Sequence, residues 1–141
     1  MTPVRMTLLA CLAVLTAVSI QAPVILAAQP HFIVGPTITT SNDAATACGK
    51  IAGLGDNQTV QIVFAATATT TCTNRGKNVP PGQTETLEGS IDASSDKNGT
   101  VSFCVSTESA TNPCPSSMTP NTSFSDFSIV VYDAAGNQIL P

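Results

Sequence analysis

Side chains alternate without interruption between Thr59 and Thr73, in the longest run of this kind in the chain. The apolar residues occupy every second position: Val60, Ile62, Phe64, Ala66 and Ala68. Successive side chains of a β-strand point to opposite faces, so this period indicates a strand with one buried face. The pattern predicts the longest strand of a β-sandwich. Beyond Ala65 the run becomes rich in threonine, so we expect its second half to bend or to leave the sheet at an edge.

Shorter alternating segments, separated by glycine- and proline-containing turns, fill the rest of the chain after residue 28. About seven or eight short strands at this spacing, without helical periodicity, are typical of a two-sheet β-sandwich. The Asn98-Gly99 pair favours the positive φ of a tight turn. It predicts that the strand around 84–91 and the strand 101–105 are joined as a hairpin. The core should be light, because the whole chain has no Trp, one Tyr and five Phe.

Residues 1–28 have the layout of a secretory signal peptide. A basic residue precedes an apolar segment from Leu8 to Ile20, and small residues precede the expected cleavage point after Ala28. Gln21 interrupts the apolar segment before it reaches the ~20 residues that a membrane-spanning helix needs. We therefore expect a single mature domain over 29–141. It should be secreted to the extracellular space, with the periplasm or the cell surface as alternatives.

The predicted mature segment is acidic, with four Lys/Arg against nine Asp/Glu and a net charge of −5. A surface with so few cations has little attraction for nucleic-acid phosphates or anionic lipid. We therefore expect no nucleic-acid partner and no membrane insertion after signal cleavage. Frequent β-branched residues in alternating order indicate an ordered chain.

Four cysteines remain after the predicted signal peptide: Cys48, Cys72, Cys104 and Cys114. An even number in a small exported domain indicates two disulfides. The cysteines lack the close Cys-x-x-Cys spacing of a zinc site. Strand parity turns Cys48 and Cys104 away from the core, which favours the pairing Cys48–Cys104 with Cys72–Cys114. The more local pairing, Cys48–Cys72 with Cys104–Cys114, stays open.

Residues suited to catalysis or metal binding are few. His31 is the only histidine and lies near the predicted mature N-terminus, where the fixed geometry of a catalytic triad is not expected. Glu85 and Glu88 should point to opposite faces of one strand rather than across a cleft. Several turn residues could offer oxygen ligands to calcium, but they lack the ligand series of an EF-hand: Asp92, Asp96, Asn98, Asp126 and Asp133. We therefore expect no catalysis, no cofactor and no metal site.

Two turn motifs resemble those of bacterial immunoglobulin-like modules. Asp96-Lys-Asn-Gly-Thr-Val-Ser-Phe103 resembles their Asp-x-x-Gly-x-hydrophobic-x-Phe hairpin. Val131-Tyr-Asp-Ala-Ala-Gly-Asn137 is similar to the Asp-x-x-Gly-Asn turn that precedes their last strand. The resemblance implies an immunoglobulin-like two-sheet sandwich with Greek-key connections, serving in adhesion, spacing or binding. The four cysteines and the single copy of the domain depart from that family.

The most plausible contact surfaces are two long loops, residues 74–82 and 108–120. Binding residues concentrate on loops that a rigid scaffold carries. A Cys72–Cys114 bond would join these loops into one patch, whose candidate contact residues are Arg75, Lys77, Asn112 and Met118. This predicts a non-catalytic binding, interaction or structural module with a protein or glycan partner. One alternative is a carrier with an apolar cleft of ~300 Å³ or more for a small ligand. Another is an enzyme with an unrecognised site.

Asn-x-Ser/Thr sequences begin at Asn57, Asn98 and Asn121 and fit the N-glycosylation pattern. They can carry glycans only in a host that has the corresponding machinery.

Overall fold

The computed structural model describes residues 29–77, 79–80 and 82–141, and this part of the chain contains strands and no helix. The strands are β1 (His31–Thr40), β2 (Ala45–Ala52), β3 (Thr59–Thr73), β4 (Gln83–Ser94), β5 (Val101–Ser106), β6 (Thr119–Asp133) and β7 (Gln138–Leu140). Accordingly, the described residues include no helix that could span a membrane. The predicted signal peptide, residues 1–28, lies outside the described residues.

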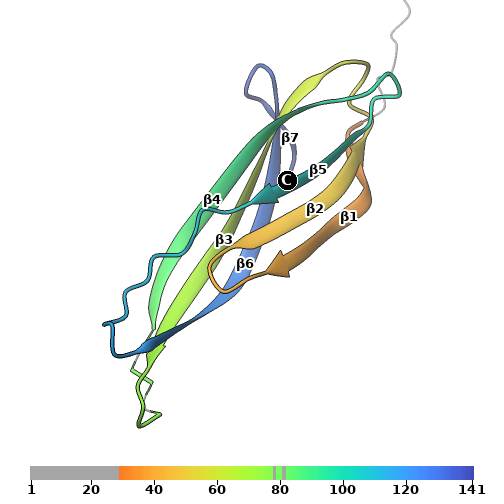
Figure 1. The fold of residues 1–141 in the computed structure, drawn as a ribbon. Coiled ribbons are helices and arrows are strands. Elements are labelled where there is room, and N and C mark those ends of the chain that lie inside the picture. The colour runs from red at the N-terminus through yellow and green to blue at the C-terminus, as the bar shows by residue number, and fades with distance from the viewer. Residues whose placement is uncertain (1–28, 78, 81) are drawn as a thin grey trace, which may run out of the picture.

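The strands form two antiparallel sheets that face each other across one hydrophobic core (Figure 1). One sheet has the order β1-β2-β5 and the other the order β4-β3-β6-β7. Ile51, Phe103 and Val105 of the first sheet belong to the same buried cluster as Phe64 and Val131 of the second. The predicted all-β two-sheet sandwich is therefore confirmed, with a strand number inside the predicted range.

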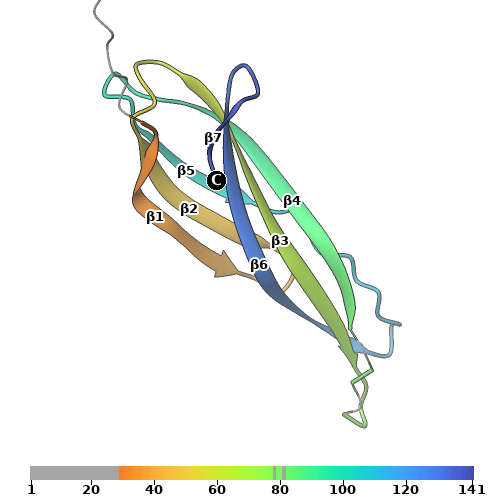
Figure 2. The ribbon, with the colours of Figure 1, turned by 180° about the vertical axis from the view of Figure 1, so that it is seen from behind.

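β3 begins and ends at the predicted residues and buries the predicted face, from Val60 to Ala68. It pairs with β4 as far as Thr70 and with β6 as far as Thr73. Figure 2 shows it between these two strands. Of the two alternatives predicted for its second half, a bend or departure from the sheet at an edge, the departure is wrong. The threonine-rich half stays inside the sheet because β4 and β6 are long enough to pair with it.

β6 contains a β-bulge opposite the middle of β3. Ala65 pairs with Ser128 and Thr67 with Ser125, so three steps along β6 match two steps along β3. Asp126 lies in the bulge with a φ of 51°. Aspartate tolerates this left-handed conformation better than most residues other than glycine. The bulge therefore forms without needing a glycine at this position.

The bulge lets β6 direct apolar side chains of both sequence parities toward the core. Phe124 is at an even position, whereas Phe127, Ile129 and Val131 are at odd positions. A regular strand would turn one of these sets to solvent. In the structure Phe124 and Ile129 both pack against the core, and Phe127 stacks on Phe64 with ring centroids 6.2 Å apart.

Both disulfides have the pairing that strand parity favoured. Cys48 and Cys104 are directly opposite each other on β2 and β5, with a Cα separation of 4.1 Å. Cys72, at the end of β3, is bonded to Cys114 in the loop before β6. The local alternative, Cys48–Cys72 with Cys104–Cys114, is excluded.

The Asp96–Gly99 turn does not form the predicted hairpin. It connects β4 to β5, which belong to different sheets. Gly99 has the expected positive φ of 72°. The preceding Ser95 is 3% exposed; its hydroxyl donates to the Gly55 carbonyl at 2.6 Å and accepts from the Gln58 amide at 2.9 Å. These long-range bonds hold the end of β4 against the β2–β3 loop, so the chain crosses to the other sheet.

Asp96 and Asp133 organise their two turns in the same way. In each turn, Oδ1 accepts hydrogen bonds from the backbone amides two and four residues further on, at 2.8–3.0 Å. Hydrogen bonds to a carboxylate favour its charged form. Those from Thr100, first of all from its backbone amide, lower the pKa of Asp96. Those from Asn137, first of all from its side chain, lower the pKa of Asp133.

Acid should lower the stability of this fold by protonating Asp96 and Asp133 in the two turns. A carboxyl group whose pKa is lower in the folded state stabilises the fold fully above its unfolded pKa of about 3.9. That contribution is lost as the pH falls through the folded pKa. We expect the Tm, measured by circular dichroism between pH 2 and pH 7, to decline below about pH 4. The D96N/D133N variant should show a smaller decline than wild type, whereas D92N, at an exposed strand position, should follow wild type. An equal decline in all three proteins would contradict this assignment.

The two sheets approach each other most closely along β4 and β5. The Glu108 amide, just after β5, donates to the Glu88 carbonyl at 3.0 Å. A Cβ atom added to Gly89 would overlap the carbonyl oxygen of Ser106. Gly89 is therefore required for backbone to pack on backbone at this flank.

The G89A variant should lower the free energy of unfolding by about 2 kcal/mol or more, because the added methyl group forces the two strands apart. Urea unfolding followed by fluorescence or circular dichroism measures this change. The matched control is G35A, whose added Cβ has no heavy atom within 4 Å. We expect G35A to stay within about 0.5 kcal/mol of wild type. Equal stabilities of the two variants would show that the β4–β5 contact is not tight.

Candidate functional site

Two loops meet at one end of the sandwich and form a continuous surface, which we call the tip surface. The first loop joins β3 to β4 and is described at residues 74–77, 79–80 and 82; the second, residues 107–118, joins β5 to β6. Thr73 pairs with Thr119, and the Cys72–Cys114 disulfide links the end of β3 to the second loop. In Figure 1 the two loops lie at the lower end of the molecule. The predicted union of the two loops through Cys72–Cys114 is therefore present.

Hydrogen bonds fix the second loop to the scaffold. Glu85 on β4 accepts from the Thr111 amide at 2.6 Å and from the Thr111 hydroxyl at 3.1 Å. The Ala110 amide donates to the Asp43 carbonyl at 2.6 Å. Asn112 accepts from the Cys114 amide at 2.9 Å through its side-chain oxygen. The loop is thus held to β4 and to the β1–β2 turn before it reaches the disulfide.

A groove of about 570 Å³ runs between the two loops. Arg75 lines it from the first loop, and Ser116, Ser117 and Met118 line it from the second. Apart from Arg75, its lining side chains are uncharged hydroxyls and amides with the apolar side chains of Met118 and Pro120. Such a surface can donate hydrogen bonds, pair with an anionic group and cover a small apolar area.

The tip surface carries positive charge on an otherwise acidic protein. Arg75 and Lys77 supply two of the four cations of residues 29–141, and both are exposed. Residues 74–82 and 112–118 contain no aspartate or glutamate, and Glu108 is the one acidic residue of the second loop. The carboxylate of Glu85 is nearby in sequence but is bonded to Thr111. The local field at the tip therefore favours an anionic or polar partner.

The four predicted contact residues have different positions. Arg75 and Met118 both line the groove. Lys77 lies in the same turn as Arg75, with a φ of 60° and its amide bonded to the Asn74 carbonyl. Asn112 uses its side chain to hold the Cys114 amide, so it shapes the loop. Sequence reasoning missed Ser116 and Ser117, although their place next to Met118 in the disulfide-linked loop could have indicated them.

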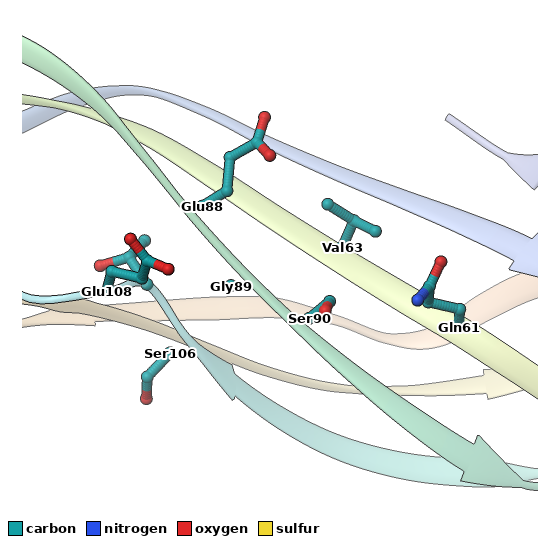
Figure 3. Close-up of a pocket in the computed structure, with 8 residues that line it drawn as sticks. Gln61, Val63, Glu88, Gly89, Ser90, Ser106 and Glu108 are labelled. Carbon is teal, nitrogen blue, oxygen red and sulfur yellow. The ribbon is translucent and has the colours of Figure 1, made fainter.

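A second groove, of about 600 Å³, lies on the outside of the β4–β5 flank (Figure 3). Glu88 and Glu108 are its charged lining residues. In Figure 3 their carboxylates lie on different sides of β4 and do not point toward one another. They are therefore not arranged as a catalytic pair across a bond. Glu85, the other member of the carboxylate pair considered from the sequence, is turned toward Thr111.

A third groove, of about 590 Å³, lies at the opposite flank, between β1 and β6, and is mainly apolar. Its volume exceeds the ~300 Å³ that a carrier of small ligands would need. Phe127 contributes to it and is 38% exposed. Sequence patterns could not indicate where such a groove would lie, because its position depends on which sheet edges are left uncovered.

The remaining candidates are dispersed. His31 begins β1, and its ring nitrogen contacts the Gln29 carbonyl at 2.9 Å. Asp96 and Asp133 each accept bonds within their own turns. Asp126 lies in the β6 bulge. Across 29–77, 79–80 and 82–141, no group of three or more His, Cys, Asp or Glu residues could hold a metal ion.

No protein-family model matches the chain, and no curated protein shows a significant match to it. The two intramolecular disulfides indicate an oxidising environment such as the extracellular space.

Loss of the Cys72–Cys114 bond should loosen the tip surface selectively. We expect the C72A/C114A variant to lose about 3 kcal/mol of unfolding free energy. Amide exchange of residues 107–118, measured by mass spectrometry, should become faster. The matched control, C48A/C104A, should also lose stability but keep the slow exchange of this loop. Equal exchange of the loop in the two variants would show that the disulfide does not hold the tip.

Proposed function

We propose that residues 29–141 form an exported, non-catalytic binding module that contacts a protein or glycan partner through the tip surface. The observation that carries this proposal is the Cys72–Cys114 bond, which joins two loops from different parts of the sequence into one groove-bearing surface. Rigid scaffolds that present loops in this way are common carriers of binding sites.

The composition of the groove supports this proposal. Arg75 offers a planar fork of donors that suits carboxylate or other anionic groups. The serine hydroxyls of 116–117 can adapt to a polar partner, and Met118 adds a flexible apolar contact. Because the loop is tied down by Glu85 and by the disulfide, less conformational entropy is lost on binding.

Export is part of the proposal. The sequence layout of residues 1–28 supports a cleaved signal peptide, and the two disulfides support an oxidising destination. Release into the medium, retention in the periplasm and display at the cell surface are all compatible with these two observations.

We also propose that the sandwich is immunoglobulin-like. In an immunoglobulin constant-type domain, the first, second and fifth strands share one sheet, and the third, sixth and seventh share the other. The orders β1-β2-β5 and β4-β3-β6-β7 support this relationship, with β4 added to the second sheet. Cys48–Cys104 joins neighbours within one sheet, whereas the antibody disulfide joins the two sheets.

Alanine substitution tests the tip surface. The purified mature protein is screened on a glycan array and against exported proteins of the host, and the Kd of the best partner is measured for each variant. We expect R75A and M118A to weaken binding at least about tenfold, because both side chains line the groove. K77A should act mainly at low salt, through a longer-range charge effect. N112A should weaken binding indirectly, by releasing the Cys114 amide.

The matched control is K97A, which removes an exposed cation from the turn at the opposite end of β3. Its Kd should equal that of wild type. Binding that survives all four tip substitutions would place the contact surface elsewhere and overturn the proposal.

A further inference from the structure

The apolar groove at the β1–β6 flank lies between two strand edges. Phe32, Pro36 and Ile38 of β1 line one side, and Phe127, Ile129 and Val130 of β6 line the other. Its volume is about 590 Å³, and none of its lining side chains is charged. It is separate from the tip surface, which lies where β3 ends and β6 begins.

The apolar surface of this groove is continuous with the hydrophobic core. Among the residues that the structure describes, the exposed large hydrophobic side chains are Ile33, Val34, Val79 and Phe127, and Phe127 is the one of these four that lines the groove. Phe127 stacks on the fully buried Phe64, with an angle of 10° between the ring planes. One face of its ring is therefore part of the core while the rest stays accessible. Exposed apolar surface that is continuous with a core is typical of a binding groove.

The borders of the groove are poorly suited to pair with a further β-strand. On its outer side β6 pairs with β7 only near Val131 and Tyr132. The edge beyond that point is interrupted by the bulge at Asp126. Pro36 and Pro141, on the other borders of the groove, have no amide hydrogen to donate. Bulges and prolines at sheet edges prevent strand addition, so an occupant must be held by side chains.

We propose that this groove binds an uncharged, mainly apolar small molecule with an aromatic or aliphatic body. The volume lies within the ~300–1,000 Å³ of sites for small ligands. Phe32 and Phe127 offer aromatic contacts, and Ser128 and Gln138 can each form a hydrogen bond at the border. The net charge of −5 over residues 29–141 and the absence of a cation among the groove-lining side chains disfavour organic anions.

Two fluorescent probes of matched shape test this proposal. Phenylnaphthylamine is neutral, and anilinonaphthalene sulfonate has the same ring system with an added negative charge. We expect phenylnaphthylamine to bind at one saturable site for each chain, and the sulfonate to bind more weakly. The F127S variant should weaken phenylnaphthylamine binding at least about tenfold, because the probe loses its aromatic contact.

V79S is the matched control, since Val79 is an exposed apolar residue outside the groove. It should leave the affinity unchanged. Q138K changes a groove-lining side chain of β7 that is exposed and remote from the core. This substitution at an exposed position should leave the fold intact. Because it adds a positive charge to the groove, it should raise the affinity for the sulfonate. Thermal unfolding of each variant establishes that the protein is folded.

The proposal is overturned if phenylnaphthylamine shows no saturable binding, or if folded F127S and wild type bind it equally. It is also overturned if sedimentation shows a wild-type dimer that F127S abolishes and that does not bind the probe, because a second copy would then cover the groove. These results do not depend on the tip surface, so either proposal can fail without the other.

Discussion

The pairing of β3 on both of its sides is the constraint on which the rest of the structure depends. β3 contributes a continuous buried face from Val60 to Ala68, and its backbone is hydrogen bonded to β4 and to β6. Its two ends then define the two ends of the sandwich. At one end, the β2–β3 loop is hydrogen bonded to the side chain of Ser95. At the other end, Cys72 attaches the long loop that precedes β6. Both the two-sheet scaffold and the tip surface therefore depend on the position of β3.

The two flanks of the sandwich are closed in different ways. At the β4–β5 flank, Gly89 allows backbone to pack directly on backbone. At the β1–β6 flank, β7 is only three residues long, and the bulge at Asp126 reshapes the edge of β6. The first flank excludes side chains from the contact, whereas the second leaves apolar side chains accessible. The same two sheets therefore form a stabilising contact at the β4–β5 flank and a candidate binding groove at the β1–β6 flank.

Sequence patterns predicted the features that depend on local alternation. The bounds and buried face of β3 follow from its period of two, and the parity of Cys48 and Cys104 favoured the disulfide pairing that the structure shows. Local patterns could not predict that the Asp96–Gly99 turn connects strands of different sheets, because the same turn residues occur in hairpins and in connections between sheets. The hydrogen bonds of Ser95 direct the chain to the other sheet, and their partners are about forty residues away in sequence.

The bulge left a visible signal, since Phe124 and Phe127 have opposite parity yet both belong to the apolar set of β6. The apolar groove had no such signal, because it depends on the sheet order and on the short length of β7. At the tip, the sequence identified the two loops and favoured the disulfide that joins them. It could not distinguish Arg75 and Met118, which line the groove, from Asn112, whose side chain holds the loop.

Both disulfides span the first tip loop, because Cys48 and Cys72 precede residues 74–82 while Cys104 and Cys114 follow them. Exposed loops are preferred sites of proteolytic cleavage. A single cut in this loop leaves two fragments that remain covalently connected twice and hydrogen bonded across β3 and β4. The protein can thus present an exposed, irregular loop to its surroundings and stay in one piece after that loop is cleaved.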